Sequence, residues 1–535
     1  MPSSFAAASV LAASTVPDWG AFALVELDVT IDESSAFRVA AATDEFVTRS
    51  TDSPANAPFL GTLRKSLAID QSIVGSRGFG EIAVTVGELE MINTEADYDV
   101  LINRPGYGIA GRRVLIKAGR IVDGEVEAYN NFVTIADLTA TGWHVDDEIL
   151  RVTLRDNSYK LEVPAQPEVY AGTGHLEGGT EVSGKRKPWA FGRFPNVTPA
   201  PVIPAELVYQ VSYRAIQQVD AVYDSGVALT LDADYVTSAL LRAATLLPGE
   251  YATCLAEGLI RLGGSPDGVV TCTGRGDSAG SYVETTASIV RRIVTVAASV
   301  TDPDDLDVSS FSLVNIQQAA PIGYYLDYQS DEMVVDSVRK LMGSIGGWGH
   351  WLRSGLFAVR RFAAPSIAPI SYYDQYDMLA VPKREPLPSA VDPPPKRFRI
   401  RYDRNWTLQE SGVVAVVSDD RRAWLATPGR LASTSDADAT EILADYPLAQ
   451  DPEPIEAYFA LEADAQAEAD RLLALYRDNR ALYRIRVKNR VFAHDLGQVI
   501  NLAYPRFDLD SGVSTVIVEL KDDSSENETE MLLFV

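Results

Sequence analysis

The chain has 535 residues, of which 46% are hydrophobic and 23% are charged. This composition excludes a mostly disordered chain, and at roughly 100–200 residues per domain the length predicts three or four domains. Lys and Arg number 47 against 74 Asp and Glu, and the resulting net charge of −27 disfavours a protein whose main task is to bind DNA or anionic membranes. Two cysteines, Cys254 and Cys272, exclude a disulfide framework and a four-thiolate zinc site.

The first part of the chain predicts a β-rich block. Residues 5–16 are rich in Ala and Ser and have no basic residue before them, so we expect a strand or short helix packed on the first domain rather than a signal peptide. No apolar run approaches the ~20 residues that span a bilayer. Short apolar runs separated by turn residues indicate a barrel or sandwich, at 24–29, 81–86, 113–117 and 149–154.

Residues 164–205 differ in composition from what precedes them. Seven prolines and six glycines fall in this stretch, so we expect little regular structure and interpret it as a long ordered connector between domains.

Residues 206–380 mix helix and strand patterns. Apolar residues recur at helical spacing over 251–262, where Gly263 and Gly264 would end the helix, and again over 289–297 and 334–345. A hairpin is predicted at 221–231, and a strand pair is predicted at 348–359 around Ser354 and Gly355.

Prolines return at 381–395, which predicts a stiff linker. After it, residues 397–402 and 483–488 alternate basic and apolar side chains as strands do, residues 461–476 predict a long amphipathic helix, and a closing hairpin is expected over 516–535. We therefore divide the chain into a β-rich domain at 1–163, a connector at 164–205, an α+β middle part at 206–380, a linker at 381–395 and a second β-rich domain with one long helix at 396–535.

Two motifs could carry chemistry. Ser278 lies in a G-x-S-x-G motif, but a nucleophile elbow needs a helix directly after the motif, and only His350 or His494 could serve as its base. We interpret the motif as a glycine-rich loop. The acidic run at 302–307 could bind a cation through its oxygens, yet it lacks the glycine and distal Glu of a calcium loop, so a solvated loop with a helix cap is expected.

An aromatic group could stack on sugars, although core or interface positions are commoner for such residues. Its members are Trp348, Trp351, Tyr372, Tyr373 and Tyr376. We assign no catalytic residue, no metal and no cofactor.

Two ladders of basic side chains stand out in this acidic chain. One strand face carries Arg397, Arg399 and Arg401, and another carries Arg484, Arg486 and Lys488. A solvated sheet face with Asp or Glu partners on neighbouring strands is one interpretation, a subunit interface is a second, and nucleic-acid contact is a third. We retain the six residues as candidate subunit-interface residues.

Several phrases, taken in their order along the chain, resemble tail proteins of long-tailed bacteriophages and prophages. They are KPWAFGRFPNV at 187–197, LVYQV at 207–211, VDAVYDSG at 219–226 and LIRLGG at 259–264. Near the end, RIRYDRNWT at 399–407, LGQVINL at 496–502, YPRF at 504–507 and SG at 511–512 are similar to the closing part of the baseplate hub (tail-tip hub) family. The resemblance covers roughly residues 22–535.

The resemblance implies a structural role without catalytic residues. Hub proteins lie at the distal end of the tail tube, usually as homotrimers, and each subunit contributes two tube-like β-barrel domains to a ring of six similar units. The expected fold class is therefore α+β and β-rich, with two tube-like β-barrels and an intervening α+β domain. The implied function is to close the tail tube and form the channel for DNA ejection.

The implied location is the distal end of the virion tail, after assembly in the host cytoplasm. Implied partners are further copies of the chain, tail-tube and distal tail proteins, tail-tip and fibre proteins, the tape measure protein and DNA that passes without specific binding, with no membrane insertion. A channel lined by carboxylates would repel phosphate, which leaves the arginine ladders at subunit contacts. A receptor- or glycan-binding tail-tip module and a hydrolase that uses Ser278 stay open as alternative functions.

Overall fold

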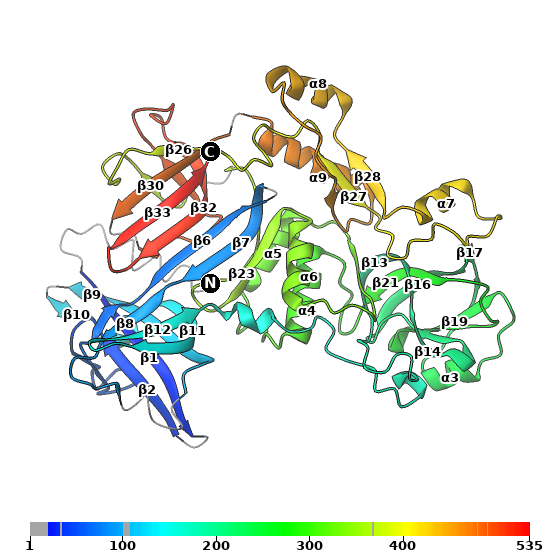
Figure 1. Ribbon diagram of the computed structural model, residues 1–535, viewed down its shortest axis with the longest axis horizontal. Coiled ribbons are helices and arrows are strands. Elements are labelled where there is room, and N and C mark those ends of the chain that lie inside the picture. The colour runs from blue at the N-terminus through cyan, green and yellow to red at the C-terminus, as the bar shows by residue number, and fades with distance from the viewer. Residues whose placement is uncertain are drawn as a thin grey trace.

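The computed structural model describes residues 20–32, 35–76, 78–99, 108–122, 124–365, 369–478, 480–488 and 491–535. The strand or helix expected at 5–16 lies outside these residues. The described part is α+β and rich in strands, with seven α-helices and several sheets, and no sheet in that part closes on itself. The fold class is therefore confirmed as β-rich α+β, whereas closed barrels are not seen among the described strands. Figure 1 shows two β-rich parts on one side, helices at the centre and a mixed lobe on the other side.

The first sheet is formed by residues of the N-terminal block. Its strands follow the order β2-β1-β9-β11-β12-β8-β5, and neighbouring strands are antiparallel. Along β9, Val114 and Ile116 are buried in the core of this sheet while Arg113 is exposed, as a half-buried strand requires. The strand bounds are β1 Gly20–Asp32, β2 Ser35–Ala42, β5 Leu63–Lys65, β8 Glu88–Ile92, β9 Arg112–Val122, β11 Val133–Val145 and β12 Ile149–Arg155.

Strands from both ends of the chain form the second large sheet. β6 (Ala68–Gly75) and β7 (Gly78–Val86) make a hairpin, and β6 pairs antiparallel with β32, from Ser72 opposite Glu519 to Ala68 opposite Asp523. The other strands of the sheet are β25 Tyr372–Tyr373, β26 Lys383–Glu385, β30 Leu482–Lys488, β31 Val499–Leu502, β32 Val513–Asp523 and β33 Glu528–Phe534. The N-terminal block thus contributes two strands to the sheet that the C-terminal segment builds (Figure 1).

The lobe on the other side carries two five-stranded sheets and one short helix. One sheet contains β13 Trp189–Val197, β16 Ile216–Asp224, β17 Val227–Ala228, β21 Val270–Asp277 and β22 Gly323–Leu326. The second contains β14 Ala200–Ile203, β15 Val208–Gln210, β18 Thr230–Asp234, β19 Glu250–Cys254 and β20 Leu259–Leu262, beside α3 Ser238–Ala243. Two core clusters fill the lobe: one contains side chains from both sheets, and the other contains side chains of the second sheet and α3.

Helices and a strand pair occupy the centre and the top of the molecule. α4 (Thr286–Ala297), α6 (Val334–Gly343) and α9 (Glu462–Tyr476) confirm three of the helices predicted from apolar spacing. The hairpin of β23 (Gly347–Trp351) and β24 (Phe357–Arg361) is also confirmed. The remaining elements are α5 Val308–Gln317, α7 Asp419–Leu425, α8 Asp436–Asp445, β27 Arg399–Tyr402, β28 Arg430–Ser433 and β29 Ile455–Glu456.

The helix predicted at 251–262 is wrong. β19 and β20 occupy this stretch and are joined by a single 3-10 turn at Leu255–Glu257. Gly258 has a φ of +63°, and a Cβ there would lie 2.1 Å from the carbonyl oxygen of Ser212. The apolar spacing fitted a helix, but pairing of β20 with β15 and β19 buries the same side chains in the sheet.

The expectation of little regular structure at 164–205 is wrong for its second half, because β13 and β14 lie there. Pro195 falls inside the register shift between Phe194 and Val197 in the pairing of β13 with β21, where an N–H donor is not required. Pro201 lies on β14, an edge strand. Both prolines therefore occupy positions that a sheet tolerates.

Arg353 joins the N-terminal sheet, the β23–β24 hairpin and the C-terminal segment. It lies in the turn between β23 and β24, and its buried guanidinium donates to the carbonyl oxygens of Phe492 and His494 at 3.0 and 3.1 Å and of Ile135 on β11 at 3.4 Å. It also forms an ion pair with Asp495 at 3.4 Å. Burial alone would raise the pKa of Asp495, but Arg353 and other nearby cationic side chains lower it below its ordinary value.

We expect Arg353→Met to destabilise the protein by about 3–5 kcal/mol, because it leaves Asp495 and two or three carbonyls buried without their cationic partner. The urea midpoint, followed by tryptophan fluorescence, measures the loss. Arg339→Met is the matched control, since Arg339 is 71% exposed in a surface pair with Asp336, and its effect should stay within about 1 kcal/mol. Equal midpoints for the two variants would contradict the assigned role of Arg353.

Candidate functional site

The basic ladder on β27 is paired within the chain. Arg397, just before the strand, forms an ion pair with Asp436, and Arg399 forms one with Asp451 at 3.4 Å. Arg401 donates through Nε to Glu456 at 2.7 Å. Each of these three arginines therefore has a carboxylate from a neighbouring segment of the same chain.

The ladder on β30 is paired more extensively. Arg484 donates to Glu385 on β26 at 2.7 Å, to Glu519 on β32 at 2.8 Å and to Glu530 on β33 at 2.9 Å. The hydrogen bond from Arg484 lowers the pKa of Glu385 below its ordinary value. Arg486 and Lys488 each form an ion pair with Glu528.

The two ladders lie on different sheets, and each has carboxylate partners on adjacent strands or loops. This arrangement satisfies the first of the three interpretations, a solvated face in which the chain supplies its own counter-charges. A role for Arg397, Arg399, Arg401, Arg484, Arg486 and Lys488 at a subunit interface stays a prediction.

We expect Arg484→Met to destabilise the fold more than Arg486→Met. The first change leaves three carboxylates facing one another beside a side chain that is only 22% exposed, which costs about 1–3 kcal/mol. The second removes a side chain that is 52% exposed, and its effect should stay below about 1 kcal/mol. Urea unfolding of both variants measures the difference, and the opposite order would contradict a structural role for the Arg484 cluster.

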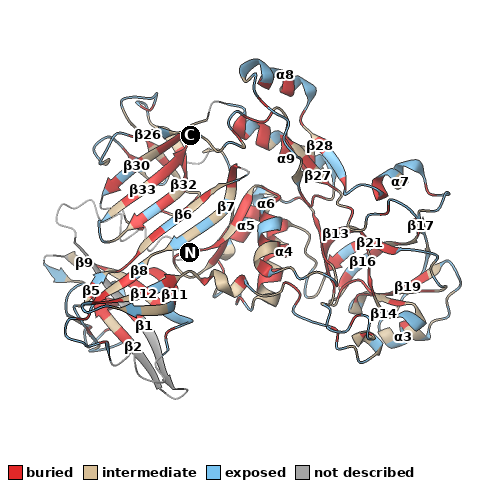
Figure 2. Cartoon of the chain, in the orientation of Figure 1, coloured by how far each residue is buried: buried red, intermediate tan, exposed pale blue. Residues whose placement is uncertain are grey.

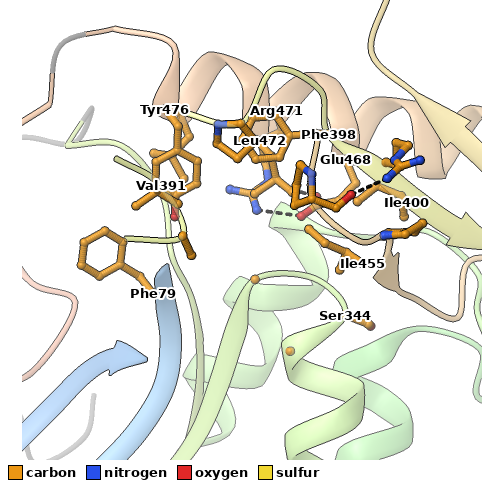
Figure 3. A pocket seen from close by; sticks show the side chains of 18 of the residues that line it. Phe79, Ser344, Val391, Phe398, Ile400, Ile455, Glu468, Arg471, Leu472 and Tyr476 are labelled. Atoms are coloured by element: carbon orange, nitrogen blue, oxygen red, sulfur yellow. Dashed lines mark hydrogen bonds and ion pairs between the residues drawn. The ribbon is translucent and has the colours of Figure 1, made fainter. Parts of the chain in front are cut away.

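A pocket of about 300 Å³ lies beside α9, where the β7 strand, the end of α6 and the proline-rich linker meet (Figure 3). Its walls include the apolar side chains of Phe79, Val391, Phe398, Leu472 and Tyr476. The aromatic rings of Phe398 and Tyr476 are stacked with centroids 6.0 Å apart. The cavity therefore offers mainly apolar contacts.

The polar wall of this pocket is an ion-paired group on α9 (Figure 3). Glu468 is buried and accepts hydrogen bonds from Arg471 at 2.7 and 3.0 Å and a further one from Arg361 on β24. Burial lowers the pKa of Arg361 even though Glu468 lies against it. The carboxylate of Glu468 and the two guanidinium groups neutralise one another, so the pocket is suited to holding an apolar group rather than to acid–base chemistry.

The G-x-S-x-G motif is organised around the residue before its serine. Asp277 ends β21 and is fully buried, and its carboxylate accepts from Trp189 Nε1 at 2.8 Å and pairs with Arg214 at 2.9 Å and with Arg292. The next helix, α4, begins only at Thr286. No role was predicted for Asp277 itself, although an acidic residue at the end of an apolar strand was the available signal.

Neither candidate histidine is hydrogen-bonded to Ser278 in the described part of the chain. His350 lies on β23, and Nε2 of His494 lies 2.6 Å from the hydroxyl of Tyr373. The structure therefore does not bring the serine and a base together as a hydrolase requires.

The acidic run at 302–307 serves local structure. Asp302 pairs with Arg291, Asp305 pairs with Lys160 at 3.5 Å, and Asp307 caps α5, which confirms the expected helix cap. Among the described residues, no group of three or more His, Cys, Asp or Glu side chains is placed to hold a metal ion.

The aromatic group predicted as a possible sugar-stacking patch is divided between core and surface. Trp348, Trp351 and Tyr373 are buried, whereas Tyr372 and Tyr376 are exposed. Figure 2 shows buried residues along the strands of the sheets and exposed residues on outer elements such as α7 and α8. At most two rings of the five are therefore available for stacking from solvent.

His350 is a buried imidazole whose charge state is coupled to folding. Burial lowers its pKa to about 3, from an ordinary value of 6.5, and Arg360 contributes in the same direction. Because the folded-state pKa is depressed, the neutral imidazole stabilises the fold fully above pH 6.5, and this stability is lost as the pH falls from about 6.5 toward 3.

We expect the free energy of unfolding to fall more steeply with decreasing pH in the wild type than in His350→Gln, by roughly 1.4 kcal/mol per pH unit between pH 6 and 4. Urea titrations at fixed pH values measure both slopes. His175→Gln, at an exposed position, is the control and should keep the wild-type slope. Parallel profiles for the wild type and His350→Gln would contradict the predicted role of the buried imidazole.

In the described part of the chain, no helix has the length and apolar character to cross a membrane.

No family model matches the chain, and no curated protein matches it either. It is similar to solved tail proteins over most of its length. A tail protein of Neisseria meningitidis MC58 is 9% identical, with 96% of both chains covered and a TM-score of 0.38. The 43 kDa tail protein of prophage MuSo2 from Shewanella oneidensis is 9% identical over 96% of this chain and 98% of its own, with a TM-score of 0.37.

A chain from the virion of a native gene transfer agent particle is 14% identical. The match covers 66% of this chain and 84% of that one, with a TM-score of 0.37. TM-scores below 0.5 do not establish a shared fold, so these likenesses carry no argument about function.

Proposed function

We propose that this chain is a structural protein of a phage-type tail, and specifically a hub that closes the tail tube and forms the channel for DNA ejection. The observation that supports this most is the pairing of β6 with β32, which ties the N-terminal and C-terminal β-rich parts into one unit. Two β-rich parts held side by side in each subunit are what a trimer needs to present six similar units. The sequence phrases that resemble hub proteins are the reason for relating these two β-rich parts to a tail hub.

In this proposal each β-rich part is one tube-like domain, completed to a barrel-like unit when the copies assemble. The six ladder residues lie near subunit contacts, and carboxylates line the channel so that DNA phosphates are repelled during passage. The partners are two further copies of the chain, the tail tube above, tail-tip and fibre proteins below and the tape measure protein within. The protein acts in the virion, at the distal end of the tail, without a cofactor or catalysis.

We expect electron microscopy of purified protein at high concentration, or of intact particles, to show a three-fold ring at the distal end of the tail with a central channel. The two β-rich parts of each subunit should alternate around that channel. A subunit found outside the tail, or a ring in which only one of the two parts faces the channel, would contradict the proposal.

A receptor- or glycan-binding module is the second candidate, favoured by the exposed rings of Tyr372 and Tyr376. Retention of the wild type on host surface polysaccharide, lost in the Tyr372→Ala/Tyr376→Ala variant, would favour this function. Unchanged particle adsorption in that variant would favour the structural hub.

A further inference from the structure

The outer face of α5 carries two exposed apolar side chains beside the polar Ser312 and Gln317. Phe311 and Val314 are buried against the core, while Leu313 is half-exposed and Ile316 is 80% exposed on the opposite side. A helix at the surface of a folded chain normally carries polar side chains on its outer face. The outer face of α5 is therefore a candidate contact surface.

A pocket of about 390 Å³ opens beside this face. Leu313 and Gln317 of α5, Trp348 of β23 and Ile370 form part of its lining, and Ile370 is itself largely exposed. The apolar surface of α5 thus continues into a cavity, which gives it a shape that a protruding side chain can fill.

The pocket also contains a cationic side chain that forms no ion pair with a described carboxylate, although it lies near enough to Asp495 to help lower the pKa of that carboxyl. Arg360 lines it and is half-buried, and its Nε is buried without a hydrogen-bond partner. No described carboxylate forms an ion pair with Arg360, whereas the neighbouring Arg361 is paired with Glu468. Because the accessible part of a half-buried guanidinium binds carboxylates through charge-assisted hydrogen bonds, the pocket is matched to a carboxylate that is accompanied by apolar groups.

The chain itself carries a projection with this chemistry. α8 extends away from the body at the top of Figure 1. At and just beyond its C-terminal end, Leu443 and Leu448 are exposed, Leu448 to 82%, and Asp445 is exposed between them without an ion pair among the described residues. We call Leu443, Asp445 and Leu448 the α8 knob. We call the cavity lined by Leu313, Arg360 and Ile370 the α5 pocket, and Ile316 lies on the exposed face of α5 beside it.

We propose that the α8 knob of one copy docks in the α5 pocket of the next copy, with Asp445 paired to Arg360 and Leu448 on the apolar face of α5. α8 and α5 are different elements of one chain, and α9 lies between them in Figure 1. A contact in which each copy gives its knob to one neighbour and its pocket to another is heterologous. A heterologous contact closes into a ring when its rotation permits. This inference deepens the proposed function and rests on its self-association of the chain.

Mixed cysteine variants test the contact directly. Ile316→Cys and Leu448→Cys place thiols at two highly exposed positions, and the natural Cys254 and Cys272 are buried, with burial raising the pKa of both thiols. Under mild oxidation we expect a covalent dimer when the two single-cysteine variants are mixed, and little when either is alone. Ile316→Cys mixed with Val236→Cys, an exposed position on the distant lobe, is the control and should not cross-link above background.

Charge reversal tests the ionic part. Arg360→Glu and Asp445→Arg should each weaken self-association measured by analytical ultracentrifugation by about tenfold or more, and the combined variant should recover most of it. Ile316→Asp, at a fully solvated position, should weaken association without affecting the fold, which circular dichroism checks. A chain that stays monomeric at all concentrations, or association that is unchanged in Arg360→Glu and Ile316→Asp, overturns the inference.

The two proposals fail in different ways. A three-fold ring at the tail end without the Ile316–Leu448 cross-link overturns the docking of α8 in the α5 pocket and leaves the hub function standing. The cross-link in a protein that is absent from the tail end overturns the hub function and leaves the contact standing.

Discussion

The pairing of β6 with β32 is the constraint on which the rest of the structure depends. It joins segments more than four hundred residues apart, and the hydrogen bond between the hydroxyls of Ser66 and Ser524 spans a separation of 458 residues. The entropic cost of closing so long a loop grows only with the logarithm of its length, so a strand pairing supported by a buried core can offset it. Its effect on the folding rate is larger, because non-local contacts must form before they stabilise anything.

The strand pairing alone would not fix how the N-terminal sheet, the β23–β24 hairpin and the C-terminal segment are oriented. Arg353 adds that information, since one guanidinium reaches the N-terminal sheet at Ile135 and the C-terminal segment at Phe492 and His494. The largest core cluster among the described residues extends through the central helices and the C-terminal sheet. Within it, the ring centroids of Phe79 on β7 and Phe534 on β33 lie 5.2 Å apart. Apolar packing supplies the stability and the buried arginine supplies the geometry, because its donors have a fixed fork.

The elements that the sequence predicts correctly are those whose signal is local. α6, α9 and the β23–β24 hairpin follow from apolar spacing and turn residues that lie within about fifteen positions of one another. The helix predicted at 251–262 is wrong because the spacing of its apolar residues fits both a helix and a strand. The pairing of β20 with the neighbouring strand β15 decides for the strand. The pairing of strands such as β6 and β32 cannot be predicted from a single sequence. Alternation of apolar and polar residues indicates that each segment is a strand, but it does not indicate which strand lies beside it.

The candidate sites also differ in whether their sequence signal is local. The arginine ladders are visible in the sequence because alternation places them on one strand face, but their carboxylate partners come from segments as distant as Glu385 and Glu519. Asp277, Arg353 and Glu468 are isolated charged residues in the sequence and become central only when the fold surrounds them. The chain has 27 more acidic than basic residues, yet Arg360 forms no ion pair with a described carboxylate. Arg360 lines a pocket with apolar walls, so the excess of negative charge that disfavours DNA binding also makes an ionic contact between copies of the chain physically reasonable at this position.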